Sequence, residues 1–162
     1  MNTVEKLSSI QVKILDKRLG STWPLPSYAT AGSAAMDLTA CLDEAVCLEP
    51  GKAKLVPTGI AMYIQNHDFA AKILPRSGLG HKQGVVLGNG TGLIDADYQG
   101  PLFVSCLNRG NTDFYVQPGD RIAQIIFIPI VRPELEIVTD FEETTRGAGG
   151  FGSTGVRATI PE

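Results

Sequence analysis

The stretch QPGDRIAQIIFIPIV, residues 117–131, decides the fold class, and it divides into a turn and a long apolar run. Pro118-Gly119-Asp120 is typical of a turn, because proline presets φ and glycine accepts a positive φ. The Ile-rich run that follows contains the β-branched residues that strands favour. Arg121 and Gln124 are polar residues within this run, and buried polar side chains need partners. The stretch therefore predicts a buried strand whose two polar residues serve either a structural ion pair or a ligand contact.

Similar short apolar runs recur between turn signals along the whole chain. We expect strands at residues 10–15, 34–42, 52–56, 60–65, 69–74, 84–87, 92–94, 102–107, 113–117, 121–131 and 135–138. Turns are expected at 49–51, 57–59, 88–90, 98–100, 109–111 and 117–120, where Gly, Pro, Asn and Asp gather. One helical turn is expected at residues 77–82. Regular short strands predict an all-β subunit, built as a sandwich, a jelly roll or a barrel.

The bulk composition limits the possible classes of function. A chain of 162 residues fits one ordinary domain. The formal net charge of −3 argues against a protein that wraps nucleic acid, since phosphate backbones attract basic surfaces. Residues 1–16 lack the apolar core of a signal peptide, and the longest apolar run, 125–131, is too short to cross a bilayer. We therefore expect a soluble, cytoplasmic protein with no nucleic-acid partner and no membrane partner.

The cysteines and histidines give no disulfide framework and no metal cage. Cys41, Cys47 and Cys106 are irregularly spaced and form no C-x-x-C pair. His67 and His81 lie fourteen positions apart and form no H-E-x-x-H motif. We expect reduced, partly buried thiols. Any metal ion would be bound together with a small-molecule ligand, since these residues form no metal site of their own.

The character of the chain changes near its C-terminus, where residues 144–155 contain five glycines. GAGGFG, residues 147–152, matches the dinucleotide pattern G-x-G-x-x-G, but only ten residues follow it, too few for a βαβ unit. The backbone N–H groups of such an arm can cradle phosphates, with Arg146 adding a bidentate fork. A disordered tail is an equally open interpretation. We divide the chain into a β domain, residues 1–140, and a flexible arm, residues 141–162.

Three further segments carry groups suited to a nucleotide. PRSGLG, residues 75–80, offers a cation, a hydroxyl and glycines that can grip a polyphosphate, although a helix cap by Ser77 is the simpler interpretation. GNGTGLIDADYQG, residues 88–100, predicts a hairpin whose open backbone can pair with a base edge, or else an ordinary Gly-rich hairpin. Within it, Asp95 is able to take a proton from water. AGSAAMDL, residues 31–38, places Asp37 at a strand start, where turn capping is the default.

Together these segments resemble, in order, the five motifs of the trimeric dUTPase family. The motifs lie at residues 31–38, 75–79, 88–100, 118–124 (PGDRIAQ) and 146–155 (RGAGGFGSTG), and the match runs from about Val12 to Gly155. The resemblance implies a jelly-roll-like, distorted β-barrel subunit and a homotrimer with active sites at the subunit interfaces. It also implies Mg²⁺-assisted hydrolysis of dUTP to dUMP and diphosphate, which limits dUTP and supplies dUMP for thymidylate synthesis.

The resemblance also implies roles for the residues that would hold the nucleoside. Asp95 would be the general base that activates the attacking water. Tyr98 would stack on the deoxyribose and leave no room for a 2′-hydroxyl. Uracil would be recognised by Asn89 and by main-chain groups of Gly92, Leu93, Ile94 and Phe103.

The remaining roles concern the phosphates. The outer phosphates would be held by Arg76, Ser77 and Gly78, and the α-phosphate by Gln124. Asp37 would face Mg²⁺ through its water shell, and Arg121 would support the site from behind. The arm would complete a neighbouring subunit's active site through Arg146, Phe151, Ser153 and Thr154.

Two positions depart from the family's pattern, because Ala35 stands where Gly is common and Thr91 where Val is usual. If position 35 needs a positive φ, alanine there is strained. Two other functions stay open: a dCTP deaminase of the same fold, and a non-catalytic nucleotide-sensing trimer. The context of Asp95 and the complete arm motif favour the dUTPase.

Overall fold

The computed structural model describes residues 6–144 and 147–148. The chain divides into two compact units, Met1–Val131 and Arg132–Glu162. The division expected from the sequence, at residue 140, falls inside the second unit. Among the described residues, all helices and strands belong to the first unit.

The first unit contains ten strands and one short helix in its described part. The strands are β1 (Gln11–Ile14), β2 (Met36–Thr39), β3 (Val46–Leu48), β4 (Ala53–Tyr63), β5 (Phe69–Leu74), β6 (Val85–Leu87), β7 (Gly92–Ile94), β8 (Pro101–Asn108), β9 (Phe114–Val116) and β10 (Arg121–Pro129). The helix is α1 (Ser77–Gln83), which ends at Gly84 with a φ of 71°. The helical turn predicted at residues 77–82 is therefore confirmed.

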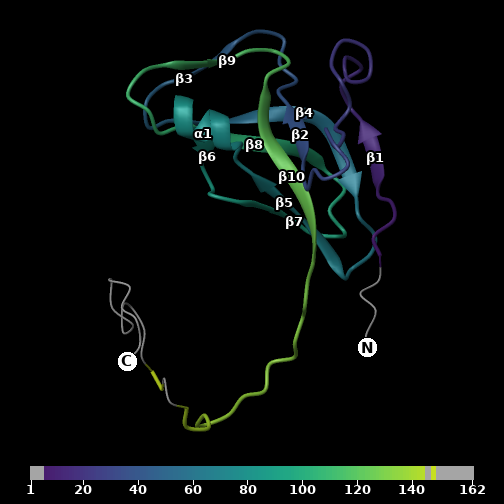
Figure 1. Ribbon diagram of the computed structural model, residues 1–162, viewed down its shortest axis with the longest axis vertical. Helices are drawn as coiled ribbons and strands as arrows, with labels where there is room; N and C mark the ends of the chain where they lie inside the picture. Colours follow the sequence, from purple (N-terminus) through teal and green to yellow (C-terminus); the bar gives the residue numbers. More distant parts are fainter. Residues whose placement is uncertain (1–5, 145–146, 149–162) are drawn as a thin grey trace. The chain divides into compact units, whose positions relative to one another are not determined.

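Two antiparallel four-stranded sheets form the body of this unit (Figure 1). One sheet has the strand order β1-β4-β8-β6, and the other has the order β2-β10-β5-β7. A separate two-stranded ribbon pairs β3 with β9. Strands that follow one another in the chain, such as β5 and β6, lie in different sheets. This arrangement confirms the all-β, jelly-roll-like fold.

One hydrophobic core is shared by both sheets, and strand alternation explains its composition. On β8, Leu102 and Val104 are buried, whereas the intervening Phe103 is exposed. The buried polar side chains of Thr58 and Asn108 are satisfied. Thr58 donates its hydroxyl to the carbonyl of Leu102 at 2.8 Å, and the Asn108 amide donates to two carbonyls at 2.7 Å.

The turn predicted at residues 57–59 is instead a bulge inside one long strand. The strands predicted at 52–56 and 60–65 together form β4, and the register against β8 shifts between Pro57 and Ala61. Gly59, with a φ of 71°, lies in this bulge, and its carbonyl accepts the N–H groups of Leu15 and Asp16. Pro and Gly mark bulges as well as turns, which explains the wrong division. The short strand β3 was not predicted.

Two other sequence predictions are wrong. Residues 135–138 form no strand in the described chain, where Leu135 and Ile137 are 91% and 97% exposed. A strand needs a hydrogen-bonded neighbour, and none pairs with this segment there. Residues 88–100 do not form a two-stranded hairpin, because β7 pairs with β5 whereas the flanking strands β6 and β8 pair with each other. No helix of the described residues has the length and apolar character to span a bilayer.

Candidate functional site

Three of the segments singled out in the sequence meet at one edge of the second sheet. Gln124 on β10 lies opposite Asp37 on β2 and, on its other side, opposite Leu74 at the end of β5. Leu74 is followed by Pro75 and Arg76, which lead into α1. The strand order β2-β10-β5 therefore brings residues 31–38, 75–80 and 118–124 to one place.

Asp37 binds two guanidinium groups at this edge. Its Oδ1 accepts the Nε–H of Arg76 at 2.9 Å, and its Oδ2 accepts an Nη1–H of Arg121 at 3.1 Å. Arg76 also donates from Nη1 to the main-chain carbonyl of Arg121 at 3.2 Å. Two guanidinium groups and one carboxylate leave one net positive charge, which favours the approach of an anion. Arg121 reaches this place through its ion pair with Asp37.

The start of α1 differs from the simpler sequence interpretation. Arg76 occupies the N-cap position, with φ −83° and ψ 132°, and no side chain caps the helix. Ser77 is therefore not the cap, and its hydroxyl is exposed at the first helical position. Gly78 follows it with no heavy atom within 4 Å of the place where a Cβ would stand. These groups are free to meet a ligand.

Gln124 connects the same edge to a shallow cavity. Its Nε2 donates to the carbonyl of Pro75 at 2.9 Å, which holds the backbone just before Arg76. The cavity has a volume of about 300 Å³ and is lined by Ser27, Ala29, Ser33, Ala34, Ala35, Asp37 and Gln124. Ala35 is not among the described residues with a positive φ, so alanine is unstrained at this position. Ser27 and Ala29 carry no sequence signal for a site, since they belong to an irregular loop.

A second cavity, of about 280 Å³, lies beside the turn between β7 and β8. It is lined by Leu93, Ile94, Asp95, Tyr98, Pro101, Leu102 and Phe103. The structure thus brings together five of the residues expected to contact the nucleoside or the water, and it adds Pro101 and Leu102. Asp95 and Tyr98 are both exposed to solvent here. A solvent-exposed carboxylate and an aromatic ring therefore line the same cavity.

Tyr98 is held in place by its own turn. Its N–H donates to the carbonyl of Asp95 at 3.2 Å, and its hydroxyl donates to the carbonyl of Pro101 at 2.9 Å. A Cβ at Gly100 would meet the hydroxyl oxygen of Tyr98 and would lie 2.7 Å from its Cζ. Glycine at position 100 therefore lets the ring lie against the backbone of the turn.

Asn89 lies in the turn between β6 and β7. The turn is closed by two bonds, Gly90 N–H to the Leu87 carbonyl and Thr91 N–H to the Asn89 carbonyl, at 3.1 and 2.8 Å. Gly90 has a φ of 71°, and the side chains of Asn89 and Thr91 are exposed. Asn89 and Gly92 are not among the cavity-lining residues.

The two groups of site residues are far apart within one chain. Ile94, the residue before Asp95, lies opposite Ala71 on β5, whereas Arg76 comes after Leu74 and Pro75, beyond the C-terminal end of β5. Arg76 is five residues after Ala71, which corresponds to roughly 17 Å along an extended chain. Asp95 and the arginine cluster of one chain therefore lie toward opposite ends of β5.

The described residues supply no metal cage, since no three His, Cys, Asp or Glu side chains come together. Asp37 is the acidic residue at the edge where Arg76 and Gln124 meet. Each of its oxygens accepts one guanidinium N–H, and a carboxylate oxygen has a second lone pair for a water molecule. Asp37 therefore fits a hydrated cation that a triphosphate brings with it. The residues expected from the arm, Arg146, Phe151, Ser153 and Thr154, lie outside the described residues.

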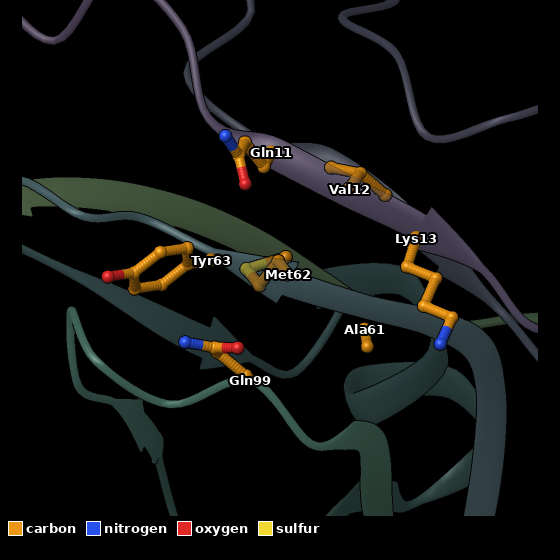
Figure 2. A pocket seen from close by; sticks show the side chains of 7 residues that line it. All are labelled: Gln11, Val12, Lys13, Ala61, Met62, Tyr63 and Gln99. Atoms are coloured by element: carbon orange, nitrogen blue, oxygen red, sulfur yellow. The ribbon is translucent and has the colours of Figure 1, made fainter.

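Another cavity of the first unit, of about 240 Å³, borders the Asp95 turn only through Gln99 (Figure 2). Figure 2 shows Gln99 beside Tyr63, with Gln11 and Lys13 on the neighbouring strand β1. The cavity shares none of the residues expected at the site. We assign this cavity no part in the candidate site.

Comparison with known proteins gives one consistent family. The dUTPase family model matches residues 21–155. A deoxyuridine 5′-triphosphate nucleotidohydrolase of Acinetobacter baumannii is 64% identical over 146 residues, which cover 90% of this chain and 97% of that protein. The enzyme of the same name from Xanthomonas campestris pv. campestris is 60% identical over 149 residues, covering 92% and 98%.

Solved structures agree with the sequence comparisons. A mutant dUTPase of Staphylococcus bacteriophage 80alpha with dUpNHpp has a TM-score of 0.80 at 28% identity, covering 92% of this chain and 99% of that one. A mutant dUTPase from phage phi11 of S. aureus, described with a structural Mg(II) ion, has a TM-score of 0.73 at 25% identity, covering 84% and 100%. The ordered motifs, the two-sheet fold and a family match over most of the chain lead to one conclusion: this chain belongs to the dUTPase family.

Proposed function

We propose that this chain hydrolyses dUTP to dUMP and diphosphate, with Asp95 as the general base. The observation that carries the proposal is the cavity beside the β7–β8 turn, where the carboxylate of Asp95 lies next to Tyr98 and Phe103. Membership of the dUTPase family, and relatives named as dUTP nucleotidohydrolases, supply the substrate class. The reaction limits dUTP and supplies dUMP for thymidylate synthesis.

In this mechanism the cavity holds the nucleoside. Main-chain groups of Gly92, Leu93, Ile94 and Phe103, together with Asn89, recognise uracil, and the ring of Tyr98 packs on the deoxyribose. Asp95 takes one proton from a water molecule, and the water oxygen attacks the α-phosphorus. The bond from the α-phosphorus to the bridging oxygen breaks, and diphosphate leaves with the bonding electron pair. Tyr98 is positioned for this task by its bond to the carbonyl of Pro101.

The phosphates bind at the edge where Asp37, Arg76 and Gln124 meet. Arg76 and the exposed Ser77 and Gly78 hold the outer phosphates, and Gln124 holds the α-phosphate. Fixed cations and hydrogen-bond donors stabilise the charge that develops on the phosphates during the reaction. Arg121 keeps the Asp37 carboxylate in place at 3.1 Å.

The cofactor is Mg²⁺, which enters with the triphosphate and neutralises part of its charge when bound. Asp37 would hold the ion through water, because this carboxylate still has acceptor sites beside the two guanidinium groups. A structural Mg(II) ion described for the phage phi11 enzyme supports the choice of metal.

The active form is a homotrimer, with each site shared between subunits. The separation of roughly 17 Å along β5 supports this, because Asp95 of one chain then serves the arginine cluster of another. An exposed apolar face also supports an assembly. Leu55 on β4 and Phe103 on β8 are 71% and 48% exposed, and apolar surface of this kind is typical of protein interfaces.

The C-terminal arm, residues 141–162, completes the site of a neighbouring subunit through Arg146, Phe151, Ser153 and Thr154. Leu135, Ile137 and Phe141, just before or within it, are more than 90% exposed and need an apolar partner. A cytoplasmic location is supported by three free thiols, since reduced cysteines are typical of that compartment.

The test is diphosphate release from dUTP with Mg²⁺, measured beside UTP, dTTP and dCTP, with an ammonia assay on dCTP. Release from dUTP alone supports the proposed reaction and its selectivity. Ammonia from dCTP would instead identify a deaminase, and nucleotide binding without turnover would identify a sensing protein. Asp95→Asn is the matched inactive control.

A further inference from the structure

Gln65, in the connection between β4 and β5, has an unusual backbone conformation. Its φ is 67°, and among residues 6–144 and 147–148 it is the one non-glycine residue with a positive φ. Glutamine rarely adopts this left-handed region, because its Cβ crowds the backbone there. Such strain persists only where the surrounding structure maintains it, and it is commonly associated with a functional site.

The Gln65 N–H points at the turn that carries Asp95, and the positive φ of Gln65 turns the following chain away from that bond. This N–H donates to the carbonyl of Ala96 at 3.1 Å. Ala96 is 6% exposed and belongs to the hydrophobic core. The next N–H, of Asn66, turns back to the carbonyl of Ile64 at 2.8 Å. The chain thus bends sharply after β4 and leaves one donor aimed at the residue that follows Asp95.

Asp95 itself lies beyond the reach of the sheet ladders. The pairing of β7 with β5 ends at Ile94, opposite Ala71, and the pairing of β8 with β4 begins at Pro101. Within the turn, Tyr98 forms only local bonds, to Asp95 and Pro101. The bond from Gln65 instead links the turn to a different part of the chain, at the carbonyl of Ala96, the residue that follows Asp95.

We propose that Gln65 is a positioning residue for Asp95: its left-handed backbone holds the N–H that fixes the Ala96 carbonyl and so orients the Asp95 carboxylate. The proposal rests on the role of Asp95 as general base. It concerns the backbone of Gln65 and requires nothing of its exposed amide side chain.

The test is a series of substitutions at position 65 that separates backbone conformation from side-chain chemistry. Gly and Asn tolerate the left-handed region, so Gln65→Gly and Gln65→Asn should keep kcat within about 2-fold. Gln65→Val is β-branched and strongly disfavours this region, and Gln65→Pro also removes the N–H. Both should lower kcat by about 10-fold or more, since small misplacements of a reacting group are costly.

Gln65→Val and Gln65→Pro should lower kcat and leave the KM for dUTP unchanged within about 2-fold. The KM is unaffected because β7, which lines the nucleoside cavity, is held in place without Gln65. Hydrogen exchange should show a protected amide at position 65 in the parent and faster exchange in Gln65→Val. Lys54→Val, at an exposed position of β4, is the control for an added β-branched residue, and its kcat should equal that of the parent.

Two results would overturn the proposal. One is a Gln65→Val protein that only melts at lower temperature while its kcat stays at the parent value. The other is Gln65→Gly or Gln65→Asn losing as much kcat as Gln65→Val, which would assign the effect to the side chain. Asp95→Asn, assayed in parallel, separates the general-base role of Asp95 from the positioning role of Gln65. Full turnover in Asp95→Asn would refute the role of Asp95 itself.

Discussion

Asp37 on β2 and Arg76 after β5 lie far apart in the sequence, yet Asp37 Oδ1 accepts the Nε–H of Arg76 at 2.9 Å. The second oxygen of Asp37 is bound to Arg121 at 3.1 Å. One carboxylate therefore orders two cations at the phosphate-binding edge. Asn at this position would keep the shape but lose the negative charge.

Asp37→Asn should raise the Mg²⁺ concentration for half-maximal activity by about 10-fold, because a partner of the metal's hydration shell loses its charge. Titration of Mg²⁺ at fixed dUTP measures this value. Arg121→Lys is the control, since it keeps a cation beside Asp37, and it should change the half-maximal concentration by less than about 3-fold. An unchanged Mg²⁺ dependence in Asp37→Asn would remove this carboxylate from the metal's surroundings.

Asp95→Asn should lower turnover of dUTP by about 10²-fold or more while nucleotide binding stays largely intact. The amide keeps the size of the side chain but cannot accept a proton from water at neutral pH. Diphosphate release and calorimetric binding of a non-hydrolysable dUTP analogue measure the two effects separately. Turnover near the parent rate would assign the base to another residue.

Gly100→Ala should disturb Tyr98, because a Cβ at position 100 would lie 2.7 Å from the Tyr98 Cζ. Overpacking of this kind costs about 1–3 kcal/mol, so we expect the KM for dUTP to rise by about 10-fold. Selectivity for dUTP over UTP should fall with it. Tyr98→Phe keeps the ring and loses only the bond to Pro101, and its KM should change by less than about 3-fold. A normal KM in Gly100→Ala would show that the ring has another position available.

Removal of the chain from Arg146 onward should reduce hydrolysis by at least about 10-fold, because cations and donors near the phosphates are lost. The trimer should persist, since the apolar face of β4 and β8 is untouched. Light scattering after size-exclusion chromatography measures the mass of the assembly. A shift to monomers would show that the arm is needed for assembly.

The three thiols should differ in reactivity. Burial raises the pKa of Cys106 to about 12 and, with Asp16 nearby, that of Cys41 to about 11. Thiolates are the reactive form, so both thiols should resist alkylation at pH 8 in the folded protein. Cys47, which is only half-buried, should react first. Mass spectrometry should find one modified thiol per native chain and three after denaturation; rapid labelling of Cys106 would indicate that the core opens.

The sequence predicts some elements to the residue and misses others for identifiable reasons. The strands at 69–74 and 92–94 agree with β5 and β7, because clear turn signals surround each apolar run. The strand β3 has only three residues, and its pairing with β9 is a long-range contact that no local pattern announces. Pro57-Thr58-Gly59 has the composition of a turn, but the register of β4 against β8 makes it a bulge.

In the candidate site too, local features could be predicted from the sequence, whereas features set by long-range strand pairing could not. Asp95, Tyr98 and Phe103 come together as expected, because they belong to one turn and its following strand. Arg121 needed a partner, but the choice of Asp37 depends on how β10 aligns with β2, which only the folded sheet determines. The left-handed backbone of Gln65 has no sequence signal at all, since glutamine is not a residue that favours a positive φ.

In the proposed trimer, the separation of Asp95 from Arg76 along β5 means that each active site combines the base of one chain with the arginine cluster of another. In a mixed population of intact and defective chains, a missing base disables a site whose arginine cluster belongs to a neighbour. The fraction of working sites then equals the fraction of chains with an intact base multiplied by the fraction of chains with an intact arginine cluster. It does not equal the average of the two fractions. Conversely, a chain that lacks its base and a chain that lacks its arginine can restore one sound site between them. In the proposed trimer, a mutation in one chain therefore affects the active sites of its neighbours, because the six-residue strand β5 separates the two groups of site residues within each chain.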